Sequence, residues 1–391
     1  MTTRRRVAVT GLGVVSPCGI GSVEFWNGLL APAPQGQRAV HDWDPTPWFD
    51  NPKEARRTDR FAQFALASAA MALEAAGEPT ATADRRGVVI GTGVGGIGTL
   101  EEQILVHHEK GPRRVSPFLV PMMMANAAGA SVSMRHGWQG PCETIVTACA
   151  AGTHSIGRAA ELIALGRCDA VLTGGSEAAL TPTGIQGFQN MTALSTTGFS
   201  RPFDVRRDGF MIAEGAAVLL LEAWDDAEAR GATILAEMLG SASTADAHHI
   251  TAPAPGGAGA VRCMQVALDD AGLSPADVVH VNAHGTSTPL NDAAEAEAMF
   301  TLFGDGGPIV TSTKGVTGHA LGAAGALEAA AVVLSMTNGL IPPTAGHEQQ
   351  DPELPKLDLV VGEPRPWTPG PSLSNSFGFG GHNGTVVFGP A

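Results

Sequence analysis

Twice in this chain of 391 residues, a strand-like run leads into a helix packed with glycine and alanine, at residues 144–166 and 309–336. Small side chains allow two such helices to approach closely within one buried layer. Further short apolar runs, such as RVAVTGLG and RGVVIGTG, alternate with helical patterns, which is typical of α/β layering with buried strands. The sequence therefore predicts an α/β protein with a duplicated five-layer α/β/α/β/α fold, one half over residues 1–235 and the other over residues 236–391.

Composition and charge exclude several classes of protein. The formal net charge is −14, whereas nucleic acid requires a basic field, so we expect no nucleic-acid partner. The most apolar helical stretch, residues 319–336, carries Glu328 in its middle, so we expect no membrane span. Five cysteines without a CxxC pair favour neither a disulfide framework nor a zinc site, and no signal peptide is expected. We therefore expect a cytoplasmic protein in a reducing compartment, with no bound metal.

Cys149 lies where the β-branched run 144–147 meets a helical pattern that starts near residue 152. The expected order is strand, tight junction and helix. A thiol at such a junction lies close to backbone N–H groups that have no partner within the helix, and their dipoles favour the nucleophilic thiolate. Cysteine is also among the most buried residue types, so a small core side chain is the alternative interpretation.

Two histidines follow strand candidates in polar, glycine-lined segments. His284 comes directly after the apolar run VVHVN, and His319 follows a strand with Lys314 five residues before it. Open α/β sheets place their ligands at the carboxyl ends of strands, which favours a functional role over a purely structural one. A buried Lys314 needs a carboxylate partner, and Glu328 is the nearest candidate in the following helix.

Three glycine-rich segments allow weaker interpretations. GTGVGG, residues 91–96, fits a dinucleotide-binding fingerprint but lies outside the first βα unit. GGSEA, residues 174–178, lacks the second glycine of a nucleophile elbow, so we assign it no hydrolase role. SNSFGFGGHNG, residues 374–384, is either a plain hairpin or a loop whose open N–H groups and phenyl rings gate a pocket.

Two basic segments stand out in this acidic chain, KEARRTDR at residues 53–60 and GPRRVSP at residues 111–117. They are either solvated surface or a docking site for an acidic partner.

Four motifs in this order, TACAAG, NAHGTSTPLND, STKGVTGHALGAAG and NSFGFGGHNG, together resemble the β-ketoacyl-acyl-carrier-protein synthases of the elongating, Cys-His-His kind, which have the thiolase fold. The resemblance covers essentially the whole chain. It implies an acyltransferase that joins an acyl group to malonyl-acyl-carrier protein by decarboxylative Claisen condensation. The family's cysteine, two histidines, lysine and carboxylate fall on Cys149, His284, His319, Lys314 and Glu328, with Lys314 expected to hold His319.

The resemblance implies further site residues. Phe379, with Gly378 and Gly380, is expected to form the gate, and the N–H groups of Phe379 and Cys149 are expected to bind the oxyanion. Thr286 and Thr288 are expected to bind the phosphopantetheine arm, and Val94 to close the acyl pocket. The basic residues expected to dock the acyl carrier protein are Lys53, Arg56, Arg57, Arg113, Arg114 and Arg207.

The resemblance leaves the pathway and the partner subunit open. The chain is expected to need no cofactor other than the carrier's phosphopantetheine. One placement is a homodimeric fatty-acid elongation synthase, and the other is the catalytic subunit of a type II polyketide heterodimer with a homologous chain-length subunit. A purely structural chain-length subunit is opposed by Cys149 itself. A thiolase is opposed by the second histidine and by the lack of a late cysteine in the C-terminal loop.

Overall fold

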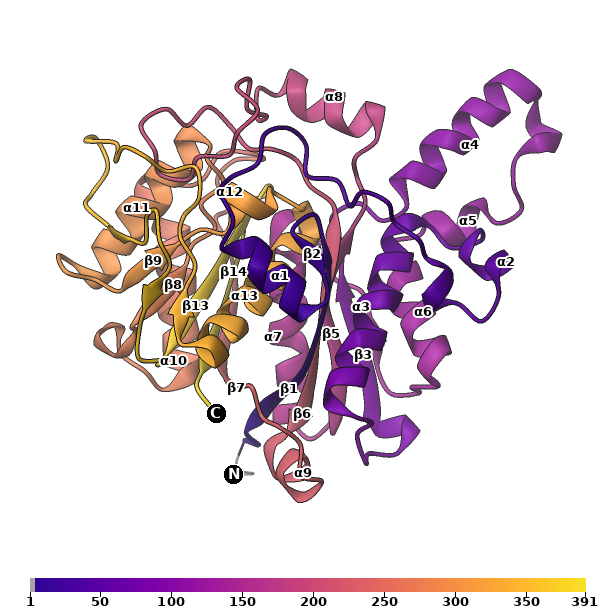
Figure 1. Ribbon diagram of the computed structural model, residues 1–391, viewed down its shortest axis with the longest axis horizontal. Coiled ribbons are helices and arrows are strands. Elements are labelled where there is room, and N and C mark those ends of the chain that lie inside the picture. The colour runs from indigo at the N-terminus through magenta and orange to yellow at the C-terminus, as the bar shows by residue number, and fades with distance from the viewer. Residues whose placement is uncertain (1–3) are drawn as a thin grey trace.

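Two sets of five strands repeat the same order and directions in the computed structural model, which describes residues 4–391 (Figure 1). The first set is β1 (Val7–Ser16), β3 (Arg86–Gly91), β4 (Cys142–Glu143), β5 (Ala170–Glu177) and β6 (Gly215–Ala223). The second set is β7 (Ala236–Ala245), β8 (His280–Asn282), β9 (Ile309–Thr311), β13 (Ser372–Gly378) and β14 (His382–Gly389).

The sheet order shows the repetition directly. The first set runs β1, β6, β5, β3, β4 and the second runs β7, β14, β13, β8, β9. In each set the first two pairings are antiparallel and the last two are parallel. The predicted duplicated α/β architecture is therefore confirmed.

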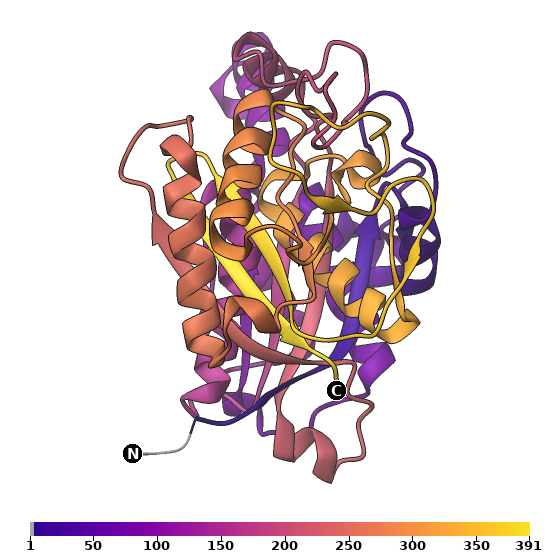
Figure 2. The same cartoon turned by 90° about the vertical axis from the view of Figure 1, so that its left-hand side faces the viewer.

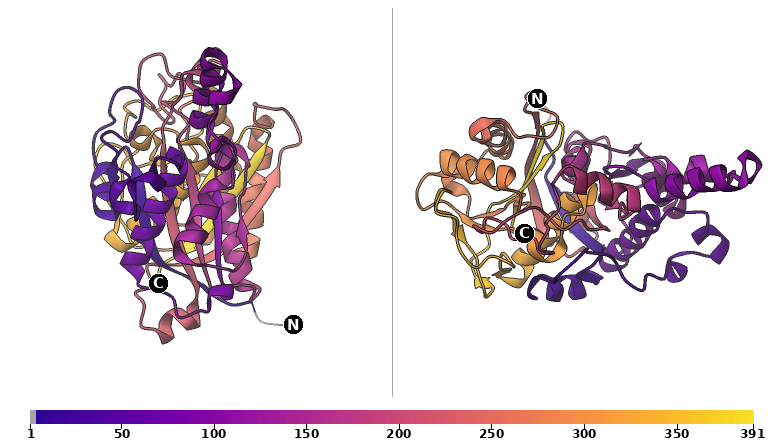
Figure 3. Two further views of the ribbon diagram at one scale, coloured as in Figure 1. Left: turned by 90° about the vertical axis from the view of Figure 1, so that its right-hand side faces the viewer. Right: turned by 90° about the horizontal axis from the view of Figure 1, so that it is seen from above.

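Helices cover both faces of each half-sheet. The central layer consists of α7 (Ala151–Ala164) and α13 (Ala324–Asn338), and each of these helices contacts strands of both halves. The outer layers contain α3 (Arg60–Ala76) against the first half and α10 (Ala258–Ala271), next to α11 (Pro289–Phe303), against the second. Figures 2 and 3 show these helices flanking the sheet from three further sides.

Glycine allows the two central helices to approach each other, as the sequence predicts. A Cβ atom on Gly152 would lie 2.9 Å from the backbone nitrogen of Ala326. A Cβ atom on Gly325 would lie 2.0 Å from Oγ1 of Thr153. Larger residues would force the helices apart, and with them the segments that precede each helix.

The two halves share one continuous sheet. Residues 7–9 of β1 pair antiparallel with residues 236–238 of β7. This pairing joins the two half-sheets at their inner edges. Strand β7 begins at Ala236, directly after the predicted division of the chain at residue 235, and that division stays a prediction.

Helix α13 and the turn before it have the length and composition of a membrane span. Over residues 4–391, only the stretch Leu321–Asn338 passes that test, and 83% of it is buried inside the protein. Its position between the two half-sheets makes it the core helix of the central layer.

The structure shows what sets the ends of α3 and corrects the boundaries expected near Cys149. Helix α3 begins at Arg60, where the Asp59 side chain accepts the N–H of Phe61, and ends before Gly77, whose φ of +72° suits glycine. The expected strand at residues 144–147 is wrong, since β4 ends at Glu143. The chain leaves the extended conformation at Thr147, with φ −130° and ψ 47°, to turn toward α7.

The remaining elements connect or flank these layers. They are α1 (Ser22–Leu29), α2 (Pro52–Ala55), α4 (Ile97–Lys110), α5 (Leu119–Met123), α6 (Ala127–His136), α8 (Pro182–Asn190), α9 (Trp224–Ala229), α12 (Lys314–Thr317), β2 (Gly19–Ile20), β10 (Leu340–Ile341), β11 (Asp358–Leu359) and β12 (Arg365–Pro366).

Candidate active site

Cys149 lies on a strained turn at the start of the central helix α7. The residue before it, Ala148, has a φ of +49°, in the left-handed region that residues with a Cβ rarely adopt. A single 3₁₀ turn over residues 148–150 then leads into α7. Only 7% of Cys149 is exposed, so the thiol is nearly enclosed.

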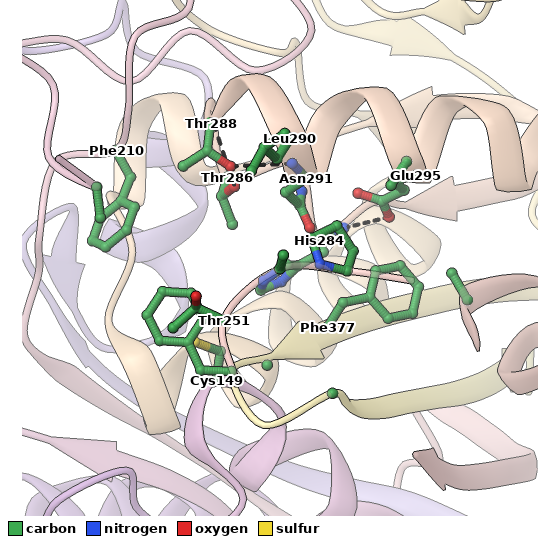
Figure 4. Close-up of a pocket in the computed structure, with 18 of the residues that line it drawn as sticks. Cys149, Phe210, Thr251, His284, Thr286, Thr288, Leu290, Asn291, Glu295 and Phe377 are labelled. Carbon is green, nitrogen blue, oxygen red and sulfur yellow. Dashed lines mark hydrogen bonds between the residues drawn. The ribbon is translucent and has the colours of Figure 1, made fainter. Parts of the chain in front are cut away.

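Both predicted histidines lie beside this thiol. The sulfur of Cys149 and one ring nitrogen each of His284 and His319 lie within 4.8 Å of one another. The two imidazole rings are 5.3 Å apart, with an interplanar angle of 84°. Figure 4 shows Cys149 and His284 facing the same pocket from different elements. The geometry therefore agrees with the predicted grouping of one thiol and two imidazoles, contributed by different halves of the chain.

Lys314 is paired with Glu328, as predicted, but it contacts the other histidine. Its ammonium forms a buried ion pair with Glu328 and lies 3.2 Å from Nδ1 and 2.6 Å from the carbonyl oxygen of His284. The expectation that Lys314 holds His319 is wrong, because the lysine side chain extends from the start of α12 toward the end of β8.

Burial controls the protonation states in this site. It lowers the pKa of both His284 and His319 well below the usual value, and the positive charge of Lys314 adds to the effect. Both imidazoles are therefore neutral near pH 7. Burial also raises the pKa of the Cys149 thiol to about 11, against the opposing influence of Lys314 and of the Phe379 N–H. Burial thus favours the neutral thiol and opposes the thiolate-favouring effect expected from the helix start.

A cavity of about 390 Å³ leads to these groups, and both predicted threonines line it. Their hydroxyl oxygens are 2.9 Å apart (Figure 4). The Thr288 hydroxyl also accepts the N–H of Asn291 and thereby caps α11. Thr286 and Thr288 therefore present adjacent hydroxyl groups to the cavity from a rigid helix start.

The C-terminal loop lies directly against the nucleophile turn. A Cβ atom on Gly378 would lie 3.1 Å from the backbone nitrogen of Cys149, so only glycine fits without a shift. Phe379 lines the cavity, and its ring centroid is 6.5 Å from that of Phe188 in α8. Gly380 is exposed, with a φ of +82° that suits glycine. The loop therefore has the position expected of a gate.

Val94 does not line the cavity that contains Cys149. It is 45% exposed, and its N–H donates to Glu177. The carboxylate of Glu177 is fully buried and also accepts hydrogen bonds from Thr92, Gly93 and Gly322. A carboxylate thus occupies the N–H groups of the GTGVGG segment, so this segment is not free to bind a pyrophosphate.

Glu295 is a site residue that sequence reasoning missed. Its buried carboxylate accepts the backbone N–H groups of His284 and Gly285, at 2.8 and 2.7 Å. It faces the cavity from α11 (Figure 4). Its spacing of three residues from the buried Asp292 places both carboxylates on one face of the helix, which was the available signal.

The two basic segments lie together on the surface. The guanidinium of Arg57 stacks 4.3 Å from the ring centre of Phe118, which directly follows the second segment. Helix α2 overlaps the start of the first segment, and α5 follows the second. Figure 1 shows these two helices side by side. The exposed cations are Lys53, Arg56, Arg57, Arg113 and Arg114.

Arg207 is the exception among the predicted docking residues. Its side chain is only 8% exposed and forms an ion pair of 2.5 Å with Asp351. A guanidinium in this environment is not available to an acidic partner, so the structure contradicts the docking role predicted for Arg207.

The thiol and the two imidazoles also form a set of donors suited to a soft divalent metal. Sulfur and two imidazole nitrogens with an open fourth direction resemble the ligands of a catalytic zinc ion. The same three groups would then be unavailable for nucleophilic chemistry.

A duplicated α/β/α/β/α fold with one buried cysteine and two neutral histidines defines a class of acyl-transferring condensing enzymes. The Beta-ketoacyl synthase N-terminal domain matches residues 31–227, and the Beta-ketoacyl synthase C-terminal domain matches residues 235–348. The chain belongs to the β-ketoacyl synthase family, with the thiolase-like fold of its structural neighbours, and it is an acyltransferase of the condensing type.

Individual relatives agree with this assignment. A 3-oxoacyl-[acyl-carrier-protein] synthase 2 of Synechocystis is 44% identical over 98% of each chain. Among solved structures, the ishigamide ketosynthase/chain length factor is 33% identical, with a TM-score of 0.92 over 99% of this chain and 100% of the other. A type II ketosynthase in complex with its acyl-carrier protein, AntDE:AntF, is also 33% identical, with a TM-score of 0.90 over the same shares.

Proposed function

We propose that this chain catalyses decarboxylative Claisen condensation of an acyl group, held on Cys149, with malonyl-acyl-carrier protein. The observation that carries the proposal is the distance of at most 4.8 Å among the Cys149 sulfur and the ring nitrogens of His284 and His319. A nucleophile and two neutral N–H donors within one enclosed cavity suit both the transfer of the acyl group and the stabilisation of an enolate.

The first half-reaction transfers the acyl group. The sulfur of Cys149 attacks the thioester of the acyl carrier, forms a new thioester and releases the carrier thiol. The proton of Cys149 passes to the leaving carrier sulfur. Because Lys314 holds His284 as a hydrogen-bond donor, His319 is the imidazole free to carry this proton. The N–H groups of Cys149 and Phe379 bind the oxyanion, and such donors are typically worth roughly 3 to 4 kcal/mol each.

The second half-reaction forms the carbon–carbon bond. The malonyl thioester loses CO2, and the N–H groups of His284 and His319 stabilise the enolate oxygen that results. The enolate carbon attacks the acyl-cysteine, and the Cys149 sulfur leaves as a thiolate. It takes up one proton from solvent, because the malonyl carboxylate leaves as CO2 without supplying one. The product is a 3-oxoacyl-carrier thioester. Neutral imidazoles suit this step, because decarboxylation requires no strong base.

The residues around the cavity have supporting roles in this proposal. Thr286 and Thr288 bind the phosphopantetheine arm, and Phe379 with Gly378 and Gly380 forms the gate between acyl loading and malonyl entry. The reaction needs no cofactor other than the carrier's phosphopantetheine. We expect it to take place in the cytoplasm.

The carrier docks, in this proposal, on the exposed cations of the two basic segments. An acyl carrier is acidic, and a local positive surface on an acidic enzyme steers the encounter. The solved complex of a related ketosynthase with its acyl-carrier protein supports a carrier as partner.

A homologous subunit is the second proposed partner. Strand β4 forms the open edge of the first half-sheet, and apolar residues near it are exposed, among them Met134 at 76% and Val146 at 50%. The greater identity to a synthase 2 favours a homodimer in fatty-acid elongation. The resemblance to ketosynthase/chain length factor pairs favours a polyketide heterodimer as the alternative.

Two experiments test this function. Purified protein with acyl-carrier and malonyl-carrier should release CO2 and form a 3-oxoacyl product, and Cys149→Ala should form no acyl-enzyme by intact mass. An acyl adduct that persists in Cys149→Ala would reject the nucleophile assignment. Co-purification from the native source separates the pathways, since a homologous partner in equal amount supports the polyketide placement and a self-pair supports elongation.

A further inference from the structure

A buried chain of hydrogen bonds lies behind the nucleophile turn. The hydroxyl of Thr147 is 2.8 Å from Nδ1 of His154, and Nε2 of His154 is 3.0 Å from the carbonyl oxygen of Asn383. The amide of Asn383 then donates to Asp246 at 2.7 Å. The chain thus begins two residues before Cys149 and ends on two residues that line the active-site cavity.

The carbonyl oxygen of Asn383 determines where the hydrogens of His154 and Thr147 lie. A carbonyl oxygen can only accept, so Nε2 of His154 carries the hydrogen. Nδ1 is then an acceptor, and the Thr147 hydroxyl must donate to it. Burial lowers the pKa of His154, which agrees with this neutral tautomer. His154 is 8% exposed, so water competes little for either bond.

The chain connects the two segments that carry the oxyanion donors. Thr147 precedes the left-handed Ala148 and the N–H of Cys149. Asn383 lies on β14, opposite Phe377 of β13, and the loop between these strands carries the N–H of Phe379. The two segments also touch, since a Cβ atom on Gly378 would lie 3.1 Å from the Thr147 carbonyl oxygen.

A second close contact holds the imidazole itself. A Cβ atom on Gly384 would lie 2.9 Å from Cδ2 and 3.0 Å from Nε2 of His154, so this edge of the ring lies against bare backbone of β14. The imidazole is therefore confined between the nucleophile turn and the β13–β14 hairpin.

We propose that Thr147 and His154 are positioning residues that hold the strained turn of Cys149 in register with the Phe379 loop. This inference rests on the proposed role of Cys149 as the nucleophile. Attack on a thioester requires the sulfur and both oxyanion donors in one geometry, and a displacement of about 1 Å can cost roughly 100-fold in rate. Neither residue lines the cavity that contains Cys149. They act by fixing the distance between two segments that do.

The test compares two reactions of the same sulfur. Acylation by an acyl thioester needs the oxyanion donors, whereas alkylation by iodoacetamide needs only the thiolate of Cys149. Thr147→Val, which removes the hydroxyl and keeps the shape, should slow single-turnover acylation at least about 10-fold and change alkylation less than about 2-fold. Thr147→Ser should restore acylation. His154→Gln, which can still reach Asn383 but offers Thr147 no acceptor in the same place, should behave like Thr147→Val.

Thr153→Val is the matched control. It removes another buried threonine hydroxyl of the same region, one that bonds to Ser376 at 2.7 Å and not to the nucleophile turn. The ratio of acylation to alkylation should stay at the wild-type value in this variant. Melting temperatures report any general loss of stability.

Two results would overturn the inference while the proposed function stands. One is acylation at the wild-type rate in both Thr147→Val and His154→Gln. The other is an equal loss of acylation and alkylation in these variants and in Thr153→Val, which indicates general destabilisation. Absence of an acyl adduct on Cys149 in the wild-type protein would instead reject the proposed function itself.

Discussion

The ammonium of Lys314 lies 3.2 Å from Nδ1 of His284, thirty residues away in the chain. An ammonium can only donate, so Nδ1 accepts and the hydrogen of this imidazole must be on Nε2. The carbonyl of the same histidine also accepts from Lys314, and its backbone N–H donates to Glu295. His284 is therefore fixed as a donor in one orientation, as the enolate-stabilising role requires.

Removing Lys314 should destabilise the fold as well as the reaction. Lys314→Met leaves Glu328 buried without its partner, which typically costs about 3 kcal/mol of unfolding free energy. The double variant Lys314→Met with Glu328→Leu should recover most of that stability but not the decarboxylation rate. Urea unfolding and CO2 release measure the two effects. A double variant with wild-type CO2 release would show that His284 needs no partner at Nδ1.

The alkylation of Cys149 should depend steeply on pH. Because burial raises the pKa of the thiol to about 11, the thiolate fraction rises about tenfold per pH unit throughout the range from pH 7 to 10. The rate of inactivation by iodoacetamide should follow this rise without a plateau. A plateau near pH 8 would mean that the helix start stabilises the thiolate more than burial disfavours it.

The contribution of Glu177 to the stability of the fold should decrease as the pH rises. Burial raises the pKa of its carboxyl from 4.5 to about 7, so the folded state holds a proton that the unfolded state releases. This stabilisation is complete below pH 4.5 and is lost as the pH rises to about 7. Glu177→Gln should therefore flatten the dependence of the urea midpoint on pH between 5 and 7.5. Parallel curves for variant and wild type would contradict the shift.

Charge reversal directly after α2 should weaken only the recognition of the carrier. Arg56→Glu with Arg57→Glu should raise the apparent KM for carrier-bound substrates, most strongly at low salt, because exposed cations steer the encounter. Turnover of a small thioester mimic should stay unchanged. Lys356→Glu, an exposed cation of the C-terminal half, is the matched control. Equal effects on carrier and mimic would argue against docking at this surface.

Added zinc should inhibit the enzyme, whereas treating the protein with a chelator alone should not. The sulfur and two ring nitrogens within 4.8 Å can bind Zn2+, which would occupy the nucleophile. Added Zn2+ should therefore block acylation, and EDTA should restore it. Untreated protein that loses activity on dialysis against EDTA would instead indicate a required metal.

The sequence predicted the repeated architecture from its alternating strand and helix patterns. It also predicted the three groups that meet at the site, because both histidines follow strand candidates and the motifs around all three groups resemble those of one family. It did not predict which histidine Lys314 contacts, since that depends on where α12 lies relative to β8. It also placed Arg207 on the surface, although Asp351, far along the chain, buries it in an ion pair. Glu177 was missed because it binds backbone N–H groups, which leave no pattern in the side-chain sequence. Glu295 binds backbone N–H groups too, and its spacing from Asp292 was a signal that went unused.

The repeated strand order gives Cys149 and His319 equivalent places, each in the segment that precedes the central helix of its own repeat. The two copies have thus diverged into complementary partners, one that supplies the sulfur and one that supplies the imidazoles. Neither repeat alone would contain both the sulfur and the imidazoles, so this chemistry requires both repeats in one folded unit.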